Sequence, residues 1–200
     1  DVYKRQTFDI MVLGSESKRD IVIADFKDQA AIEAVPNLEA DKDEYNLYDI
    51  SARVTPSAST DRINTPQRNP GQDASNCQYI NFWIHSAGAA GQKIGIVLYD
   101  TNGKLARYNN GTSNGYLIDW TDAPGDWHLV SLPRSSMVNA NANTPVDLSS
   151  IRNMRITFSS SGGVLKEGAV LHFDRIWLSV ESPSEADFVR RARWIGNEQF

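Results

Sequence analysis

Hydrophobic and polar residues alternate with a period of two in several short segments of the chain. In the segment 78–85 the apolar side chains lie on one side, and the other side carries Tyr79, Asn81, Trp83 and His85. Such alternation is typical of β-strands, whose side chains point to opposite faces in turn. The pattern predicts strands at 21–26, 78–85, 93–100, 104–108, 116–120, 127–133, 154–158 and 170–180.

The segments between the predicted strands are rich in glycine, proline and asparagine, which favour turns. Helical periodicity is weak, so we expect one short helical turn at 30–34 and another at 147–151, capped by Asp147. The polar interval 135–143 and part of the interval 41–76 are predicted to be long surface loops. Many short strands with such turns predict an all-β antiparallel sandwich or barrel.

The two ends of the chain differ from its middle. Residues 1–6 resemble a tag-like or artefactual extension, and residues 7–182 hold the predicted strands. After the last strand, Ser184 begins a capping pattern and apolar residues recur at helical spacing, which predicts a short C-terminal helix. We therefore expect residues 183–200 to be a helical linker or the start of a further domain, within a longer multi-domain protein.

Composition and charge narrow the classes of function. The 200 residues include 20 Lys and Arg against 25 Asp and Glu, a net charge of −5, with 40% hydrophobic residues. A soluble globular chain with a mildly acidic surface and no basic run is not expected to bind nucleic acid. The apolar segments are far shorter than the roughly 20 residues that a membrane span needs, so no membrane partner is expected.

The residues that usually carry catalysis form no recognisable motif. His85, His128 and His172 all fall in predicted strands, without the spacing of a helical metal site, and a Gly-x-Ser-x-Gly motif is absent. The single cysteine, Cys77, lacks a nucleophile signature and is expected to be inert. The sequence therefore predicts a protein that is not an enzyme, although spatially assembled triads and carboxylate pairs stay open.

The aromatic residues suggest a binding function. If Ile80, Phe82 and Ile84 fill the core, then Tyr79, Asn81, Trp83 and His85 form an outer sheet face. Aromatic planes cover the apolar face of a sugar ring, and polar side chains satisfy its hydroxyl groups. Tyr99 and Arg155 extend this face if their strands lie in the same sheet. The alternative is the opposite register, with Trp83 and Tyr99 in the core.

The other tryptophans have different expected places. Trp120 and Trp127 flank the turn at Pro124 and Gly125. Trp120 is the candidate for ligand binding at a loop edge, whereas Trp127 is expected to be a core residue. Trp177 shares the predicted strand face of Phe173 and is also expected in the core.

Four segments resemble the galactose-binding-like jelly rolls. These are Ala24-Asp25-Phe26, Gly125 to Pro133, Asp147 to Ile156 and Leu171 to Leu178. This family comprises β-sandwich carbohydrate-binding modules and related domains that precede the catalytic parts of bacterial polysaccharide lyases and glycoside hydrolases. The resemblance spans about residues 20 to 181, and implies an all-β antiparallel sandwich of the jelly-roll type.

The resemblance also implies a cofactor. Family members often hold a structural calcium ion, and Asp174 matches the acidic position of the last strand, with Asp25 on the first strand as a second candidate ligand. Calcium takes six to eight oxygen ligands, several of them backbone carbonyls. The alternative is that Asp174 pairs with Arg175 or Arg53.

The expected function follows from the fold and the aromatic face. We expect a non-catalytic carbohydrate-binding module of a secreted polysaccharide-degrading enzyme of bacterial type, located outside the cytoplasm or at the cell surface, with an adjacent catalytic domain as partner. The first alternative is a structural spacer that packs on that catalytic domain and binds no ligand. The second is a complete hydrolase or lyase, and the glycan itself is not specified by the sequence.

Overall fold

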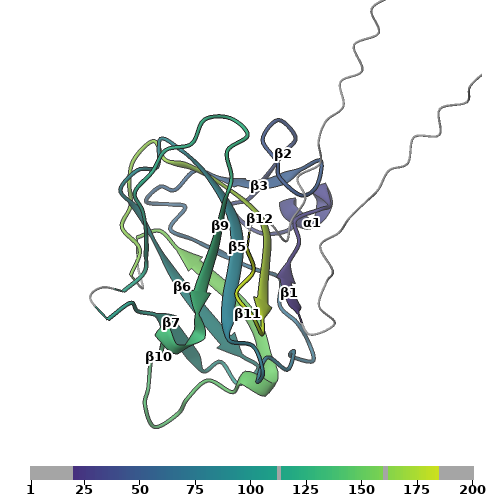
Figure 1. The fold of residues 1–200 in the computed structure, drawn as a ribbon, viewed down its shortest axis with the longest axis vertical. Helices are drawn as coiled ribbons and strands as arrows, with labels where there is room; N and C mark the ends of the chain where they lie inside the picture. The colour runs from purple at the N-terminus through teal and green to yellow at the C-terminus, as the bar shows by residue number, and fades with distance from the viewer. Residues whose placement is uncertain (1–19, 112–113, 160–161, 185–200) are drawn as a thin grey trace, which may run out of the picture.

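The computed structural model describes residues 20–111, 114–159 and 162–184. Within them the chain forms two antiparallel β-sheets packed face to face (Figure 1). This confirms the predicted antiparallel β-sandwich. The predicted extension 1–6 and the predicted C-terminal helix lie outside the described residues.

One sheet, here called the β5 sheet, has the order β2-β3-β12-β5-β9, with β1 beside the second half of β12. Its longest strands, β5 and β12, pair along almost their whole length. Its strands are β1 (Ile21–Ala24), β2 (Glu39–Asp41), β3 (Ser51–Val54), β5 (Tyr79–Ala87), β9 (His128–Pro133) and β12 (Val170–Ser179).

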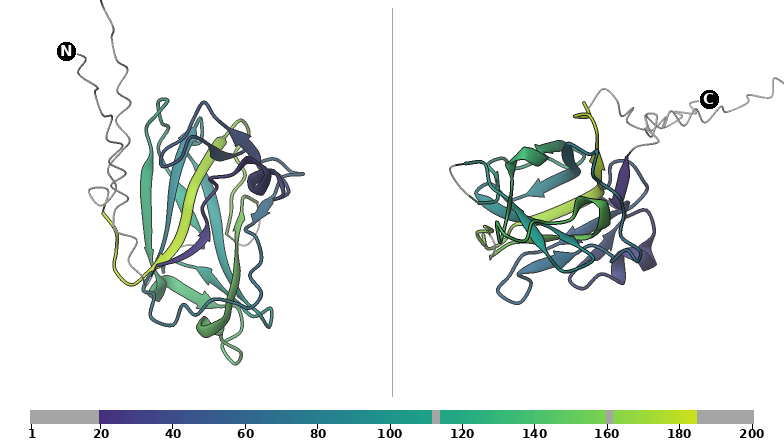
Figure 2. Two further views of the ribbon diagram at one scale, coloured as in Figure 1. Left: turned by 90° about the vertical axis from the view of Figure 1, so that its right-hand side faces the viewer. Right: turned by 90° about the horizontal axis from the view of Figure 1, so that it is seen from below.

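The second sheet, here called the β6 sheet, has the order β10-β7-β6-β11-β4, with β8 beside the first part of β6. The two layers are visible from the side and from below in Figure 2. Its strands are β4 (Arg62–Asn64), β6 (Gln92–Asp100), β7 (Leu105–Tyr108), β8 (Tyr116–Ile118), β10 (Met137–Asn139) and β11 (Ile151–Thr157).

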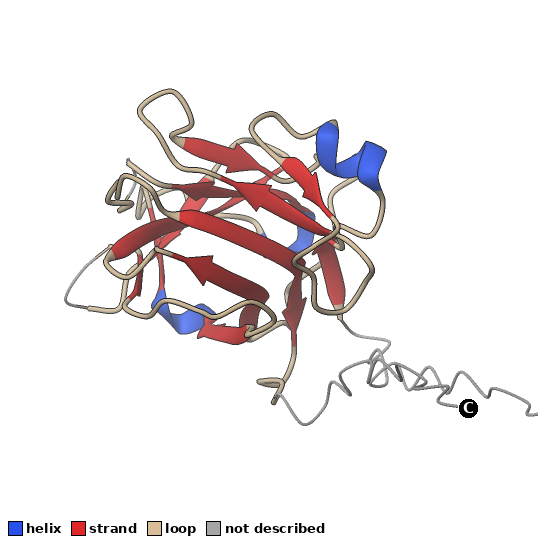
Figure 3. Ribbon diagram, turned by 90° about the horizontal axis from the view of Figure 1, so that it is seen from above, coloured by secondary structure: helices blue, strands red, loops and turns tan. Residues whose placement is uncertain are grey.

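Helical structure is confined to short turns at the margins of the sandwich (Figure 3). These are α1 (Gln29–Glu33) and the 3-10 turns η1 (Arg134–Ser136) and η2 (Leu148–Ser150). The Asp147 carboxylate accepts the backbone N–H of Ser149, which confirms the predicted cap. None of the helices in the described ranges has the length and hydropathy of a membrane-spanning segment.

The core lies between the sheets and is built by strand alternation. Ile80, Phe82 and Ile84 of β5 are fully buried there, and they belong to one cluster with Ile96 and Leu98 of β6. Each large apolar side chain removed from water contributes about 1.5–3 kcal/mol. The register predicted for the segment 78–85 is confirmed, since its apolar residues point inward.

The structure corrects the prediction of a long loop at 135–143, which contains β10 and part of η1. The interval 41–76 contains β3 and β4, but no helix or strand follows β4 within it, so the loop predicted for part of this interval is confirmed. These strands have only three or four residues, so their alternation is too brief to stand out in the sequence. They lie at or near sheet edges, where pairing with a longer strand holds them.

Candidate functional site

The outer face of the β5 sheet is covered by protein. Asn81, Trp83 and His85 point to this face, as predicted, but each side chain is almost fully buried, with Trp83 2% exposed. The Asn81 amide donates to the Ser179 hydroxyl and accepts from the Ser131 hydroxyl, so its hydrogen bonds are used within the protein. The predicted open aromatic face is therefore absent from this sheet.

Three tryptophans form a second hydrophobic cluster on this face. Trp83, Trp127 and Trp177 are 1–3% exposed and pack with Leu47 and Leu129. Leu47 belongs to residues 42–50, the segment between β2 and β3, here called the strap. Because the strap lies over the indoles, they act as a small core and not as a platform.

Trp127 and Trp177 are buried as predicted, but Trp177 lies on the face opposite to that of Phe173. The register of β12 against β5 shifts between Phe173 and Ile176, which is a β-bulge. A bulge adds one residue to the strand and so inverts the alternation beyond it. For this reason the shared face predicted for Phe173 and Trp177 is wrong.

The strap is held down by two carboxylates. Glu44 accepts hydrogen bonds from the Gly125 backbone N–H, at 3.0 Å, and from the Trp127 indole N–H, at 2.7 Å. Asp174, on β12 beneath the strap, accepts the Leu47 N–H at 2.7 Å. The position of the strap therefore depends on two sets of polar contacts, those of Glu44 and those of Asp174.

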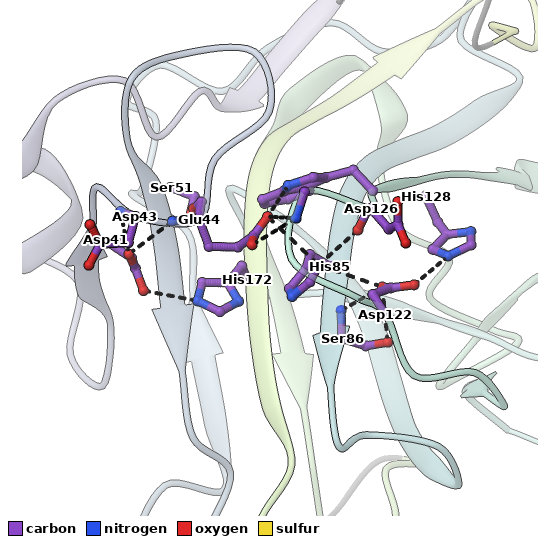
Figure 4. A network of polar contacts seen from close by, with 12 residues as sticks. Asp41, Asp43, Glu44, Ser51, His85, Ser86, Asp122, Asp126, His128 and His172 are labelled. Atoms are coloured by element: carbon purple, nitrogen blue, oxygen red, sulfur yellow. Dashed lines mark hydrogen bonds and ion pairs between the residues drawn. The ribbon is translucent and has the colours of Figure 1, made fainter.

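The three histidines join this arrangement, as Figure 4 shows. His172 Nε2 lies 3.1 Å from an Asp41 oxygen, and His85 Nδ1 donates to the Asp126 carbonyl at 2.8 Å. The His85 and His172 rings lie 5.3 Å apart. Burial lowers the pKa of His172 in spite of its hydrogen bond to Asp41. Burial opposes ionisation of Asp41, but the N–H groups of residues 43 and 44 and the His172 hydrogen bond hold its pKa below the usual value.

These contacts serve to fix loops. His85 and His172 lie beneath the strap, Asp41 ends the edge strand β2, and Asp126 lies just before β9 at the opposite edge of the sheet. His85 was predicted to bind sugar, but it is 3% exposed and engaged with the 119–127 loop. The network accordingly explains the burial of this face.

Asp174 and Asp25, the predicted calcium ligands, have different surroundings. Asp174 is fully buried, and burial raises its pKa to about 7. Its nearest described partner is an N–H group, and Asp25 pairs with Lys27 at 2.7 Å. Within the described residues no three His, Cys, Asp or Glu side chains gather as a metal site requires. Because calcium also takes backbone carbonyl oxygens as ligands, these contacts do not test calcium binding, which stays a prediction. Arg53, one of the two alternative partners expected for Asp174, pairs with Glu39.

Trp120 lies at the loop end of the sandwich and is partly exposed. Its indole N–H donates to Asp122 at 3.2 Å, and its ring centroid lies 4.6 Å from that of His128. The Asp122 carboxylate also accepts from His128 Nε2, at 2.7 Å, and from the Ser86 N–H. The arrangement presents an indole edge and a half-exposed imidazole, which is a small surface for a ligand.

Tyr79 stands apart from the other predicted residues. It lies at the opposite end of β5 and is partly exposed. With Pro133 and Glu181 it lines a shallow pocket of about 370 Å³. This position places Tyr79 near the end of the described chain and away from the covered tryptophans.

The outer face of the β6 sheet carries Tyr99 and Arg155 together, although Val97, which pairs with Arg155 on this face, is only 1% exposed. The guanidinium carbon of Arg155 lies 4.9 Å from the centroid of the Tyr99 ring, and Arg155 Nε donates to Asn64 at 2.7 Å. Both side chains are partly exposed. Since β6 and β11 do not belong to the β5 sheet, Tyr99 and Arg155 do not extend the face of Trp83.

Further side chains on this face were not identified from the sequence. Arg107 of β7 pairs with Val97 on one side and with Val138 of β10 on the other. Among the described residues, the three large apolar side chains that are exposed all belong here: Val138, Leu117 beside Lys93, and Val164 bridged to Lys93. The alternation in 105–108 indicates that Arg107 points outward, but the sequence does not reveal which strands are its neighbours.

The comparisons with solved structures identify the fold. A family 11 carbohydrate-binding module from Clostridium thermocellum, in complex with a β-1,3-1,4-mixed-linked tetrasaccharide, is 17% identical with a TM-score of 0.51. The comparison covers 82% of this chain and 98% of that module. A family 30 carbohydrate-binding module is 16% identical with a TM-score of 0.52, over 82% of this chain and 89% of the module.

No protein-family model matches the sequence, and no curated protein matches it. The similarity to the solved structures is therefore one of fold. The chain has the jelly-roll fold of the carbohydrate-binding modules, as the resemblance in the sequence implied.

Proposed function

We propose that the chain is a non-catalytic carbohydrate-binding module that holds a glycan on the outer face of the β6 sheet. The observation that carries this proposal is the contrast between the two faces. The β5 face is closed by the strap, whereas the β6 face carries the partly exposed Tyr99 ring with the Arg155 guanidinium over it and Asn64 hydrogen-bonded to Arg155. The fold shared with carbohydrate-binding modules supports this assignment.

The chemistry of the β6 face suits a sugar. The Tyr99 ring offers an apolar surface for the C–H face of a pyranose, and Arg155 and Arg107 offer N–H donors to hydroxyl groups. Desolvated hydroxyl groups need such partners, because an unpaired buried hydroxyl costs about 1–3 kcal/mol. Along β6 the face extends from Lys93 to Tyr99, about 20 Å at the usual rise per residue, which leaves room for several sugar units.

The wider context belongs to the same proposal. We infer that the module serves a secreted polysaccharide-degrading enzyme and tethers an adjacent catalytic domain to its substrate. A face of this kind, on a domain without a recognisable catalytic motif, suits targeting better than turnover. Measurable turnover of a polysaccharide by the 200 residues alone would contradict the non-catalytic role.

A second candidate function rests on a separate observation. Leu117, Val138 and Val164 are each more than half exposed, and exposed apolar side chains on one face also suit a protein contact. A structural spacer that packs its β6 face against a catalytic domain would use them. The two functions differ in one respect, because only the first binds glycan when the chain is isolated.

The test is calorimetry and affinity electrophoresis of the isolated chain against a panel of plant, algal and host glycans. Binding to at least one glycan is expected, and Tyr99→Ala should weaken it about tenfold or more, since the ring loses its stacking area. Tyr79→Ala is the matched control on the β5 sheet and should leave the affinity unchanged. Trp120→Ala distinguishes a binding site at the loop end from one on the sheet face. Loss of binding in Trp120→Ala with full binding in Tyr99→Ala would place the ligand at the loop end, and no binding to any glycan would favour the spacer.

A further inference from the structure

The two sheets differ in the charge of their strands. The six strands of the β6 sheet contain five cationic residues: Arg62, Lys93, Arg107, Arg152 and Arg155. They contain one acidic residue, Asp100, which is fully buried and accepts the N–H groups of residues 102, 104 and 147. The strands of the β5 sheet hold three acids and two Arg or Lys residues. In a chain of net charge −5, positive charge is therefore concentrated on the β6 sheet.

Most of these cations are not neutralised by the protein. Arg62 pairs with Asp61 at 2.6 Å. By contrast, among the described residues no carboxylate lies within ion-pair distance of Lys93, Arg107 or Arg155, and the polar partner of Arg155 is the neutral Asn64. Arg155 also interacts with the Asp61 carboxylate beyond ion-pair distance, so Lys93 and Arg107 keep more of their charge for a ligand. Surface cations attract anions more strongly where several act together.

The register spreads these cations over the outer face. Arg107 and Arg155 are both paired with Val97, one on each side of β6, so their Cα atoms lie about 10 Å apart. Lys93 points to the same face four residues before Val97, about 14 Å along the strand. Charges at such spacing do not converge on one small ion. They suit a chain with negative groups at intervals.

We propose that the ligand of the β6 sheet face is an anionic polysaccharide, bearing carboxylate or sulfate groups, and that Lys93, Arg107 and Arg155 bind those groups beside the Tyr99 ring. This inference rests on the proposed glycan-binding function and specifies its ligand. Guanidinium groups bind carboxylate and sulfate oxygens through paired N–H donors. A polysaccharide is favoured over a nucleic acid because the chain shares its fold with carbohydrate-binding modules.

The first experiment compares glycans that differ in charge alone. Calorimetry of the isolated chain uses polygalacturonate and its fully methyl-esterified form, with alginate and carrageenan as further carboxylate and sulfate probes and mixed-linked β-glucan as a neutral one. We expect at least one charged glycan to bind at least tenfold more tightly than the neutral ones, and its affinity to fall about tenfold at about 0.5 M salt. Preference for carrageenan over both uronates would identify sulfate as the group, and the reverse would identify carboxylate.

The outcomes separate this inference from the proposed function. Binding of neutral glycans alone, or equal binding of polygalacturonate and its methyl ester with no charged glycan preferred, overturns the anionic ligand and leaves the glycan-binding function standing. No binding to any glycan overturns both. Binding of a duplex DNA oligonucleotide as tightly as the best glycan would also contradict the inference, because it would indicate a general affinity for polyanions.

Variants locate the charge. Arg107→Gln changes an exposed side chain without a described ion-pair partner, so the fold should be kept. The affinity for the charged glycan should fall about three- to tenfold. Lys93→Gln should act similarly, and Arg155→Gln more strongly. Arg53→Gln, on the β5 sheet, removes the same charge elsewhere and is the matched control. Equal losses of affinity for the charged glycan in Arg107→Gln and Arg53→Gln would overturn the assignment of the binding site to the β6 face.

Discussion

The two outer faces of this sandwich begin from the same strand pattern and end as different surfaces. On the β5 sheet the outward residues include two tryptophans, and the strap converts them into a buried cluster. On the β6 sheet the outward residues include Tyr99 and Arg155, which stay partly exposed. Alternation therefore decides which way a side chain points, and a segment distant in sequence decides whether it meets solvent.

The comparison also distinguishes two uses of polar residues. Beneath the strap, the carboxylates and histidines form hydrogen bonds to one another, to the backbone or to the Trp127 indole, and these contacts fix the structure. On the β6 face, Arg107 and Lys93 have no described ion-pair partner and are available to a ligand. This contrast predicts that substitutions on the β5 face change stability, whereas those on the β6 face change binding.

The largest expected effect concerns the covered tryptophans. Trp83→Ala should lower the free energy of unfolding by about 3–5 kcal/mol, because it leaves a large cavity in a closed cluster. Urea denaturation followed by circular dichroism measures this loss. Trp120→Ala, at the partly exposed loop end, is the matched control and should cost about 1–2 kcal/mol. A cost below about 1 kcal/mol for Trp83→Ala would indicate that the strap leaves the indoles accessible.

The strap itself is the next test. Glu44→Ala leaves the Trp127 indole N–H and the Gly125 N–H without their acceptor, and should cost about 2 kcal/mol. Tryptophan fluorescence should shift to the red as the cluster gains water. Asp43→Ala changes a neighbouring exposed residue and should stay within about 0.5 kcal/mol. If both variants behave alike, the contacts of Glu44 do not hold the strap.

Asp174 makes the stability of the β5 face depend on pH. Its pKa is raised to about 7 in the folded protein, so the folded state binds the proton more tightly than the unfolded state. The resulting stabilisation is complete below about pH 4 and is lost as the pH rises through about 7. The pKa of His172 is lowered, so its contribution has the opposite sign. The free energy of unfolding that it contributes is lost as the pH falls below about 6.5.

Asp174→Asn removes the titrating carboxyl group and so isolates the contribution of Asp174 to the pH dependence. The amide oxygen can still accept the Leu47 N–H, so this hydrogen bond is kept. The unfolding free energy of this variant minus that of the wild type should rise between about pH 4 and 7 and level off above it. Thermal unfolding across this range measures the difference. A flat profile for Asp174→Asn would show that Asp174 is not titrating there.

The smallest effect is expected on the β6 face. Val138→Ser and Leu117→Ser alter exposed side chains and should change the free energy of unfolding by less than about 0.5 kcal/mol. If the face packs on a catalytic domain, both variants should weaken that contact in the full-length enzyme while glycan binding by the isolated chain is absent. Weaker glycan binding in either variant would instead support the sugar-binding assignment.

Most of the sandwich could be predicted from the sequence because its long strands alternate clearly. β5, β6 and β12 bury their apolar residues between two sheets, and such periodicity needs no knowledge of the partner strand. The short strands β3 and β10 were missed because three or four residues hold too little pattern, and their existence depends on pairing with a neighbour.

The candidate site was predicted only in part. Tyr99 and Arg155 were named, and they do lie together, although in the other sheet from Trp83. The burial of Trp83 was not predictable, because it depends on the contact of Leu47 from a polar segment without a hydrophobic pattern. The charge of the β6 face was not predicted either, because the sequence does not show that Arg107 and Arg155 both pair with Val97. That follows only from the order of the strands in the sheet.

An amide-resolved NMR titration with an oligosaccharide of the most tightly bound glycan locates the binding face residue by residue. The shifts are expected to concentrate on β6, β7 and β11, at Tyr99, Arg107 and Arg155, while the indole signals of Trp83 and Trp177 stay in place. Shifts concentrated on those indoles and the strap, or confined to Trp120 and the 119–127 loop, would contradict a binding site on the β6 sheet.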